Sequence, residues 1–134
     1  MNKPTTILLV DDDQDYRFQQ RVKLQGAGYT VIEADSREAA EEILAKQRPD
    51  LAIVDLMMEE LDAGFTLSYH IKKMDAHIPV ILVTAVTQET GLEFDAATGE
   101  EKSWIKADAM LAKPIRFEQL TREIDRLLNK TGAH

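Results

Sequence analysis

The chain has 134 residues, of which 44% are hydrophobic and 30% are charged, and this size predicts a single domain over residues 1–134 with a full core. Its formal net charge of −8 argues against non-specific binding to nucleic acid or anionic membranes, and the lack of cysteine excludes disulfides and thiolate zinc sites. No apolar run approaches the roughly 18 residues of a membrane span, so we expect a cytoplasmic protein.

Short apolar runs alternate with amphipathic segments along the whole chain. Strands are predicted over residues 7–10, 30–34, 51–54, 79–84 and 109–112, and helices over residues 15–27, 36–46, 65–74 and 117–128. Alternation of strands and helices implies an α/β fold with a parallel sheet covered on both faces.

The spacing of apolar residues predicts which side of each helix is buried. In residues 15–27, the side chains of Phe18, Val22 and Leu24 are expected to face the core. Ser36 is expected to cap the helix that follows it. The other predicted core residues are Ala39, Ala40, Ile43 and Leu44 in residues 36–46, and Leu120, Ile124, Leu127 and Leu128 in residues 117–128.

Charged residues follow three of the predicted strands. Asp11, Asp12 and Asp13 come after the first strand, Asp55 after the third and Lys113 after the fifth. The carboxyl ends of parallel strands meet at one edge of a sheet, where open α/β folds bind ligands. Carboxylates gathered there repel one another unless a cation joins them, and magnesium prefers oxygen ligands. We therefore expect a metal and phosphate site at this edge.

The acidic cluster has two other interpretations. Its aspartates could cap the helix that follows and interact with the helix dipole, and this interpretation suits Asp13 best. A calcium loop of the Asp-x-Asp-x-Asp type is rejected, because Tyr16 stands where glycine is needed and Val22 stands where a bidentate glutamate belongs.

Four motifs occur along the chain in an order that is typical of one protein family. They are Ile7-Leu8-Leu9-Val10-Asp11-Asp12-Asp13, Asp55-Leu56-Met57-Met58, Leu82-Val83-Thr84-Ala85 and Lys113-Pro114. Together they resemble the receiver domain of bacterial two-component response regulators over nearly the whole chain. The resemblance implies a flavodoxin-like, doubly wound sheet of five parallel strands.

The resemblance also implies a phosphorelay function. Asp55 would accept a phosphoryl group from a phosphohistidine on a sensor histidine kinase or phosphotransfer protein. Asp12 and Asp55 would bind Mg²⁺ or Mn²⁺ directly, and Asp11 would act through the metal shell. The backbone carbonyl of Met57 would complete the protein ligands. Such a domain assists only its own phosphorylation and dephosphorylation, so it is not expected to be an enzyme with a separate substrate.

Three further groups would contact the phosphoryl group if the resemblance holds. They are the Thr84 hydroxyl, the Ala85 amide and the Lys113 ammonium. Phosphoryl transfer has a loose transition state with charge on the peripheral oxygens, so a metal and fixed donors supply most of the catalysis. The small side chain of Ala85 would leave space for the added group.

A different class, the haloacid-dehalogenase phosphatases, shares part of this pattern. That family has one aspartate after its first strand and a second aspartate two residues later, as Asp11 and Asp13 are spaced here. It also needs threonine or valine two positions further on, where this chain has Asp15. The phosphatase interpretation is therefore rejected.

The chain departs from the usual receiver pattern in three places. Residues 59–64 add two glutamates beside the expected phosphorylation site, together with either an extra residue or a displaced glycine. Met110 stands where signalling receivers commonly have a switch tyrosine or phenylalanine. The segment over residues 86–108 is longer than usual, and we expect a shortened fourth helix or a hairpin-like excursion there.

Two functions follow from these observations. The first is a phosphorylatable receiver, a monomer or weak dimer, that signals by binding a downstream protein and contacts no nucleic acid or membrane. The second is a pseudo-receiver that binds partners as a scaffold without phosphorylation, which Met110 and the altered loop over residues 59–64 make conceivable. The complete set of Asp12, Asp55, Thr84 and Lys113 favours the first.

Overall fold

The computed structural model describes residues 5–56, 63–84, 108–113 and 115–131. Within these residues, the elements in chain order are β1 (Thr6–Val10), α1 (Gln14–Gly26), β2 (Thr30–Ala34), α2 (Arg37–Leu44), β3 (Leu51–Asp55), α3 (Ala63–Met74), β4 (Val80–Thr84), β5 (Ala109–Ala112) and α5 (Phe117–Thr131). Every predicted strand and helix is confirmed, with ends that differ by a few residues. Among the described residues, no helix is long and apolar enough to cross a membrane.

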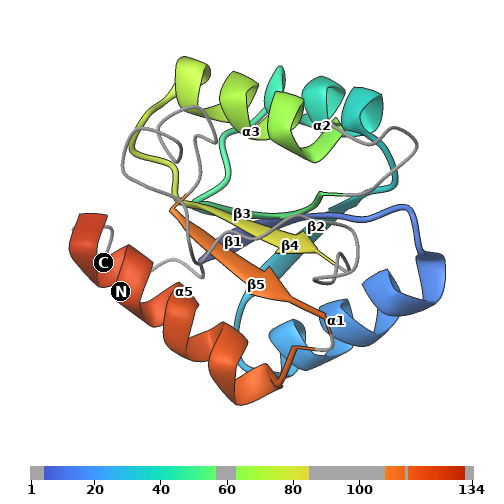
Figure 1. Cartoon of the computed structure of the whole chain (residues 1–134), viewed down its shortest axis with the longest axis vertical. Helices are drawn as coiled ribbons and strands as arrows, with labels where there is room; N and C mark the ends of the chain where they lie inside the picture. Colours follow the sequence, from blue (N-terminus) through green and yellow to red (C-terminus); the bar gives the residue numbers. More distant parts are fainter. Residues whose placement is uncertain (1–4, 57–62, 85–107, 114, 132–134) are drawn as a thin grey trace.

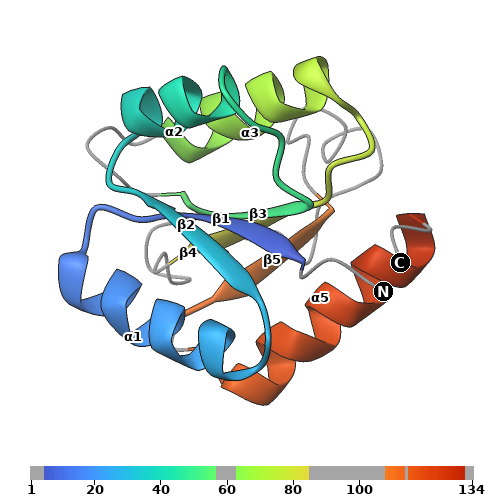
Figure 2. The ribbon, with the colours of Figure 1, turned by 180° about the vertical axis from the view of Figure 1, so that it is seen from behind.

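All strand pairs of the sheet are parallel, and the spatial order is β2-β1-β3-β4-β5. This is the flavodoxin-like, doubly wound order, as the resemblance implied. Helices α2 and α3 cover one face of the sheet and α1 and α5 cover the other, as Figure 1 and the reverse view in Figure 2 show. The strand order reverses between β1 and β3, where Val10 pairs with Val54. The residues that follow these two valines therefore lie side by side at the carboxyl edge.

The core consists of two apolar layers, because successive side chains of a strand point to opposite faces of the sheet. On β1, Leu8 and Val10 belong to the layer beneath α2 and α3, whereas Ile7 and Leu9 belong to the layer against α1 and α5. Both expected helix faces on α2 and α5 are confirmed. Ala40 is buried with Ala39, Ile43 and Leu44 packed around it, and Leu120, Ile124, Leu127 and Leu128 are buried.

The expected inward face of α1 is wrong for two of its three residues. Phe18 and Val22 are 55% and 50% exposed, whereas Leu24 is buried together with Gln20. Successive helix residues are rotated by about 100°, so Gln20 and Leu24 lie nearly opposite Phe18 and Val22. Arg17 lies on the buried side, where its Nε donates to Glu33 of β2. The side of α1 that faces the sheet therefore differs from the one that its apolar residues predicted.

Because of this orientation, we expect two apolar residues of α1 to differ in how much they stabilise the protein. Leu24→Ala should lower the free energy of unfolding by about 2–5 kcal/mol, because it leaves a cavity in the core. Phe18→Ala should change it by less than about 1 kcal/mol, because the ring is largely in solvent. Urea unfolding followed by circular dichroism measures both values. Equal losses in the two variants would show that α1 packs differently.

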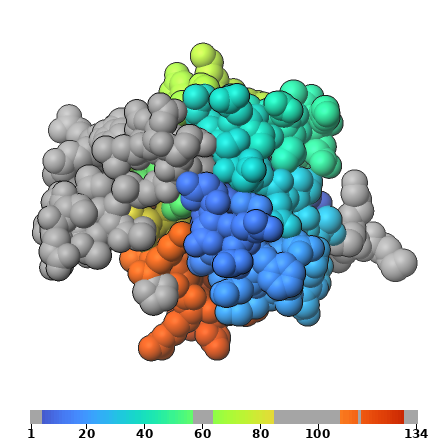
Figure 3. Space-filling model, turned by 90° about the vertical axis from the view of Figure 1, so that its right-hand side faces the viewer, coloured from blue at the N-terminus to red at the C-terminus, as the bar shows by residue number. Residues whose placement is uncertain are grey.

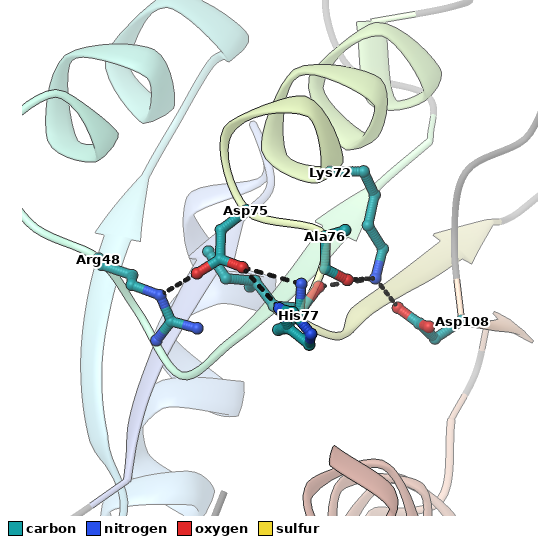
Figure 4. A network of polar contacts seen from close by, with 7 residues as sticks. Arg48, Lys72, Asp75, Ala76, His77 and Asp108 are labelled. Carbon is teal, nitrogen blue, oxygen red and sulfur yellow. Dashed lines mark hydrogen bonds and ion pairs between the residues drawn. The ribbon is translucent and has the colours of Figure 1, made fainter.

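At the amino edge of β4 and β5, ion pairs and hydrogen bonds join α3 to the sheet (Figure 4). The Lys72 ammonium lies 2.5 Å from an Asp108 carboxylate oxygen and donates to the backbone oxygens of Ile78 and Ala76 at 2.8 and 3.3 Å. Asp108 and Val80 exchange two hydrogen bonds of 2.8 Å, one through the Asp108 carboxylate and one through its amide. Asp108 therefore sets the start of β5, five residues before Lys113.

The same figure shows Asp75 between Arg48 and His77. The pKa of Asp75 lies below its ordinary value of 3.8, first because the His77 backbone amide donates to its carboxylate and then because Arg48 does. Asp75 thus ties the end of α3 to the segment before β3.

Asp108→Ala should lower the free energy of unfolding by about 1–3 kcal/mol, because it leaves the Lys72 ammonium and the Val80 amide without this acceptor. Glu42→Ala removes an exposed carboxylate on α2 and should be nearly neutral. Thermal and urea unfolding of both variants tests the role of Asp108. A neutral Asp108→Ala would mean that β5 is held in register by other contacts.

Candidate functional site

Side chains from four strands come together at the carboxyl edge of the sheet. Asp11 directly follows β1, Asp55 and Thr84 are the last residues of β3 and β4, and Lys113 directly follows β5. Figure 3 faces this edge and shows the start of α1 (blue) beside the ends of β3 (green) and β4 (yellow). Asp11, Asp55 and Thr84 are all at least 95% buried, whereas Asp12 is exposed.

The three carboxylates form a compact cluster. Asp11, Asp12 and Asp55 each offer an oxygen, and these oxygens lie within 4.8 Å of one another. In an octahedral magnesium site, with oxygens about 2.1 Å from the metal, neighbouring ligands are about 3 Å apart and opposite ones about 4 Å apart. The cluster needs only a small contraction to reach that geometry, and the exposed Asp12 side chain has room to move. The donor set is therefore of the right kind and size for Mg²⁺ or Mn²⁺.

Hydrogen bonds fix the turn that carries the acidic cluster. The Asp13 amide donates to Asp11 Oδ1 at 2.9 Å, and Asp13 in turn accepts from the Tyr16 amide as the N-cap of α1. Arg17 Nη1 donates to the Asp11 backbone oxygen at 2.7 Å. The capping interpretation therefore holds for Asp13, while Asp11 and Asp12 join the carboxylate cluster.

Lys113 reaches this cluster because β5 pairs with β4. Its amide donates to the Thr84 backbone oxygen at 2.8 Å, which continues the strand pairing one residue past β5. Its ammonium nitrogen lies 3.0 Å from Asp11 Oδ2 and 3.9 Å from Asp55 Oδ1. One ammonium balances at most one of three negative charges, so the cluster retains an excess of negative charge that a divalent cation would neutralise.

Tyr16 covers one side of the Lys113 ammonium. The lysine nitrogen lies 4.2 Å from the centroid of the tyrosine ring, within the range of a cation–π interaction. Burial raises the pKa of the Tyr16 hydroxyl to about 12, and the negative charges of Asp11 and Asp55 contribute to the increase. The ring therefore lies in the field of the carboxylate cluster.

Gly64, in the first turn of α3, lies against the backbone of the strand that carries Asp55. A Cβ atom at this position would lie 2.6 Å from both the Asp55 carbonyl oxygen and the Leu56 Cα. Both contacts are with backbone atoms, which cannot move aside without shifting Asp55. Because Gly64 has no Cβ atom, α3 can start directly beside the site.

Comparison with protein families matches residues 7–125 to the response regulator receiver domain. The chain belongs to this family. Among curated relatives, the receiver is 34% identical to the transcriptional regulatory protein RprY of Bacteroides fragilis, over 97% of the receiver and 52% of the relative. It is 31% identical to the phosphate regulon transcriptional regulatory protein PhoB of Pseudomonas aeruginosa, over 95% of the receiver and 53% of the relative. The receiver thus spans about half the length of the curated relatives that it matches.

Solved structures show the same fold. A CheY-like receiver domain from Methanospirillum hungatei superposes with a TM-score of 0.81 at 22% identity, covering 98% of both chains. The response regulator TrrA of Thermotoga maritima, solved in complex with Mg²⁺ and BeF, has a TM-score of 0.76 at 27% identity and covers 92% of this receiver and 99% of its own chain.

The structure brings together five of the seven residues predicted for the site. They are Asp11, Asp12, Asp55, Thr84 and Lys113. Met57, Ala85, the glutamates of residues 59–60 and all of the expected excursion over residues 86–108 except Asp108 lie outside the described residues. Met110 is described: it pairs with Leu82 and packs, partly buried, against the core beneath α2 and α3.

Sequence reasoning did not find Tyr16, which it considered only as a mismatch to a calcium loop. The N-cap at Asp13 was the available signal, because a helix that begins there places Tyr16 in its first turn beside the cluster.

Proposed function

We propose that this receiver accepts a phosphoryl group on Asp55 in a magnesium-dependent reaction and signals by binding a downstream protein. The observation that carries the proposal is the position of Asp55 at the end of β3, with its carboxylate in a cluster with Asp11 and Asp12 and 3.9 Å from the Lys113 ammonium. The Mg²⁺–BeF complex of TrrA, a relative in structure, supports the choice of metal.

Each residue of the site has a proposed role. Asp12 and Asp55 bind Mg²⁺ or Mn²⁺ directly, and the Met57 carbonyl completes the protein ligands. Asp11 acts through the metal shell, which agrees with its geometry because its two oxygens already accept from the Asp13 amide and contact Lys113. When bound, the cation supplies positive charge to the phosphoryl oxygens and to the cluster.

The phosphoryl group comes from a phosphohistidine on a sensor histidine kinase or phosphotransfer protein. An Asp55 oxygen forms a bond to phosphorus as the phosphorus–nitrogen bond breaks, with the electron pair of that bond remaining on the imidazole. The Thr84 hydroxyl, the Ala85 amide and the Lys113 ammonium then stabilise charge on the three peripheral oxygens. Burial of Asp55 and Thr84 keeps this charge in a region of low dielectric, where fixed donors act most strongly.

We also propose how the domain behaves as a whole. Residues 1–134 act as one unit in the cytoplasm, as a monomer or weak dimer, without direct contact to nucleic acid or membrane. The domain turns over no separate substrate.

Acetyl phosphate tests the proposal without a cognate kinase. Incubation with acetyl phosphate and Mg²⁺ should add a single phosphoryl group by intact mass, and removal of Mg²⁺ with a chelator should prevent the addition. The Asp55→Asn variant should remain unmodified. No addition to the wild type would favour the pseudo-receiver, and an equal addition to Asp55→Asn would place the acceptor elsewhere.

A further inference from the structure

We propose that Tyr16 is a positioning residue for Lys113, whose ammonium is held over the carboxylate pocket by the face of the tyrosine ring. This inference rests on the proposed phosphoacceptor function, because Tyr16 would position Lys113, and Lys113 is proposed to contact the phosphoryl group. It assigns a role to a residue outside the four motifs that identify the family.

Among the described residues, three groups from different elements surround the Lys113 ammonium. They are Asp11 after β1 at 3.0 Å, Asp55 of β3 at 3.9 Å and the centroid of the Tyr16 ring of α1 at 4.2 Å. The lysine side chain is 21% exposed and the tyrosine is half-buried, so the contact is partly shielded from solvent. A cation–π interaction is stronger when it is shielded in this way.

The ring contact differs from the two carboxylate contacts in how a bound metal would affect it. A divalent cation held by Asp12 and Asp55, with Asp11 in its outer shell, would offset the negative charge of the cluster and weaken the attraction of Asp11 and Asp55 for the lysine. The face of an aromatic ring is uncharged, and its attraction for an ammonium does not depend on free carboxylate charge. Tyr16 therefore still restrains Lys113 beside Asp55 when the metal and the phosphodonor arrive.

Lysine needs such a restraint because its charge lies at the end of a flexible stem of four carbons. A lysine that is free to leave for solvent must be ordered again each time a phosphoryl group is transferred. The N-cap of α1 fixes the backbone of Tyr16, since the Tyr16 amide donates to the Asp13 carboxylate at 3.1 Å. The acidic turn thus places the carboxylates and the backbone that carries the tyrosine ring beside the lysine.

Rates of phosphorylation by acetyl phosphate with saturating Mg²⁺ test the proposal in the full chain. Tyr16→Leu should slow phosphorylation roughly fivefold, the size expected for loss of one partly buried cation–π contact, while Tyr16→Phe should retain the wild-type rate. The matched control is Tyr69→Leu, because Tyr69 of α3 also lies beside a lysine, with Lys73 at 5.9 Å, on another helix. This control should leave the rate unchanged.

Two further measurements separate positioning from simple packing. In a Lys113→Ala background, Tyr16→Leu should cause no additional loss of rate. In NMR spectra of the unphosphorylated protein, the methylene protons next to the Lys113 ammonium should show a ring-current shift that disappears in Tyr16→Leu and persists in Tyr16→Phe. A rate loss of the same size in both backgrounds, or an unchanged lysine shift in Tyr16→Leu, would overturn the proposal.

The two proposals fail in different ways. A wild-type protein that takes up no phosphoryl group overturns the phosphoacceptor function. The NMR comparison needs no phosphoryl transfer, so it decides by itself whether the Tyr16 ring holds Lys113.

Discussion

The Asp12→Asn variant is expected to bind Mg²⁺ about tenfold to a hundredfold more weakly than the wild type, a range seen even for residues that only support a metal ligand. Asparagine keeps the shape of the side chain but removes one of three negative charges from the cluster. At Mg²⁺ concentrations well below both dissociation constants, phosphorylation by acetyl phosphate should slow by the same factor. Titration calorimetry measures the affinity, and intact mass measures the phosphorylation rate.

Asp15→Asn is the matched control for this experiment. It removes the same charge from an exposed residue in the first turn of α1, and Asp15 is not a member of the carboxylate cluster. Both variants should keep the stability of the wild type to within about 0.5 kcal/mol, because both side chains are exposed. Equal Mg²⁺ affinity in Asp12→Asn and Asp15→Asn would mean that general surface charge, and not a site, attracts the cation.

The Gly64→Ala variant is expected to lose both stability and function. The new methyl group would lie 2.6 Å from two backbone atoms of Asp55 and Leu56, and relief of such an overlap typically costs about 1–3 kcal/mol. Any relief moves Asp55, and displacement of a reacting group by about 1 Å can slow a reaction about a hundredfold. Urea unfolding and the phosphorylation assay with acetyl phosphate should therefore both show a loss.

Gly26→Ala provides the comparison, because a Cβ atom there has no neighbour within 4 Å. This substitution should be neutral or should stabilise the protein by up to about 1 kcal/mol, since alanine restricts the unfolded chain. It should also leave phosphorylation unchanged. If Gly64→Ala behaved like Gly26→Ala, α3 would not need to start so close to the site.

The sequence predicted the sheet, and the edge at which the candidate residues meet, because both depend on a local pattern. Five apolar runs were sufficient to identify the strands, and polar residues directly after these runs mark the carboxyl edge. Parallel pairing then brings Asp11, Asp55, Thr84 and Lys113 together, since residues that end paired parallel strands must share one edge.

The errors and omissions involve contacts between elements that are distant along the chain. Apolar spacing placed Phe18 and Val22 inside, but both are exposed, and the opposite side of α1 carries Arg17, which donates to Glu33 and to the Asp11 carbonyl. Periodicity within one helix contains no information about such a partner. The contact between Tyr16 and Lys113 was missed for the same reason, because these two residues are separated by most of the chain.

The identity of the modified residue tests the central claim most directly. After treatment with acetyl phosphate and Mg²⁺, the protein is reduced with borohydride, which converts an acyl phosphate to an alcohol, and its peptides are analysed by mass spectrometry. The reduced residue should be Asp55 alone, in a reaction that requires Mg²⁺ and is slowed in Asp12→Asn. Modification of another carboxylate, or of Asp55 without any need for Mg²⁺, would contradict a metal-dependent phosphoacceptor site at the end of β3.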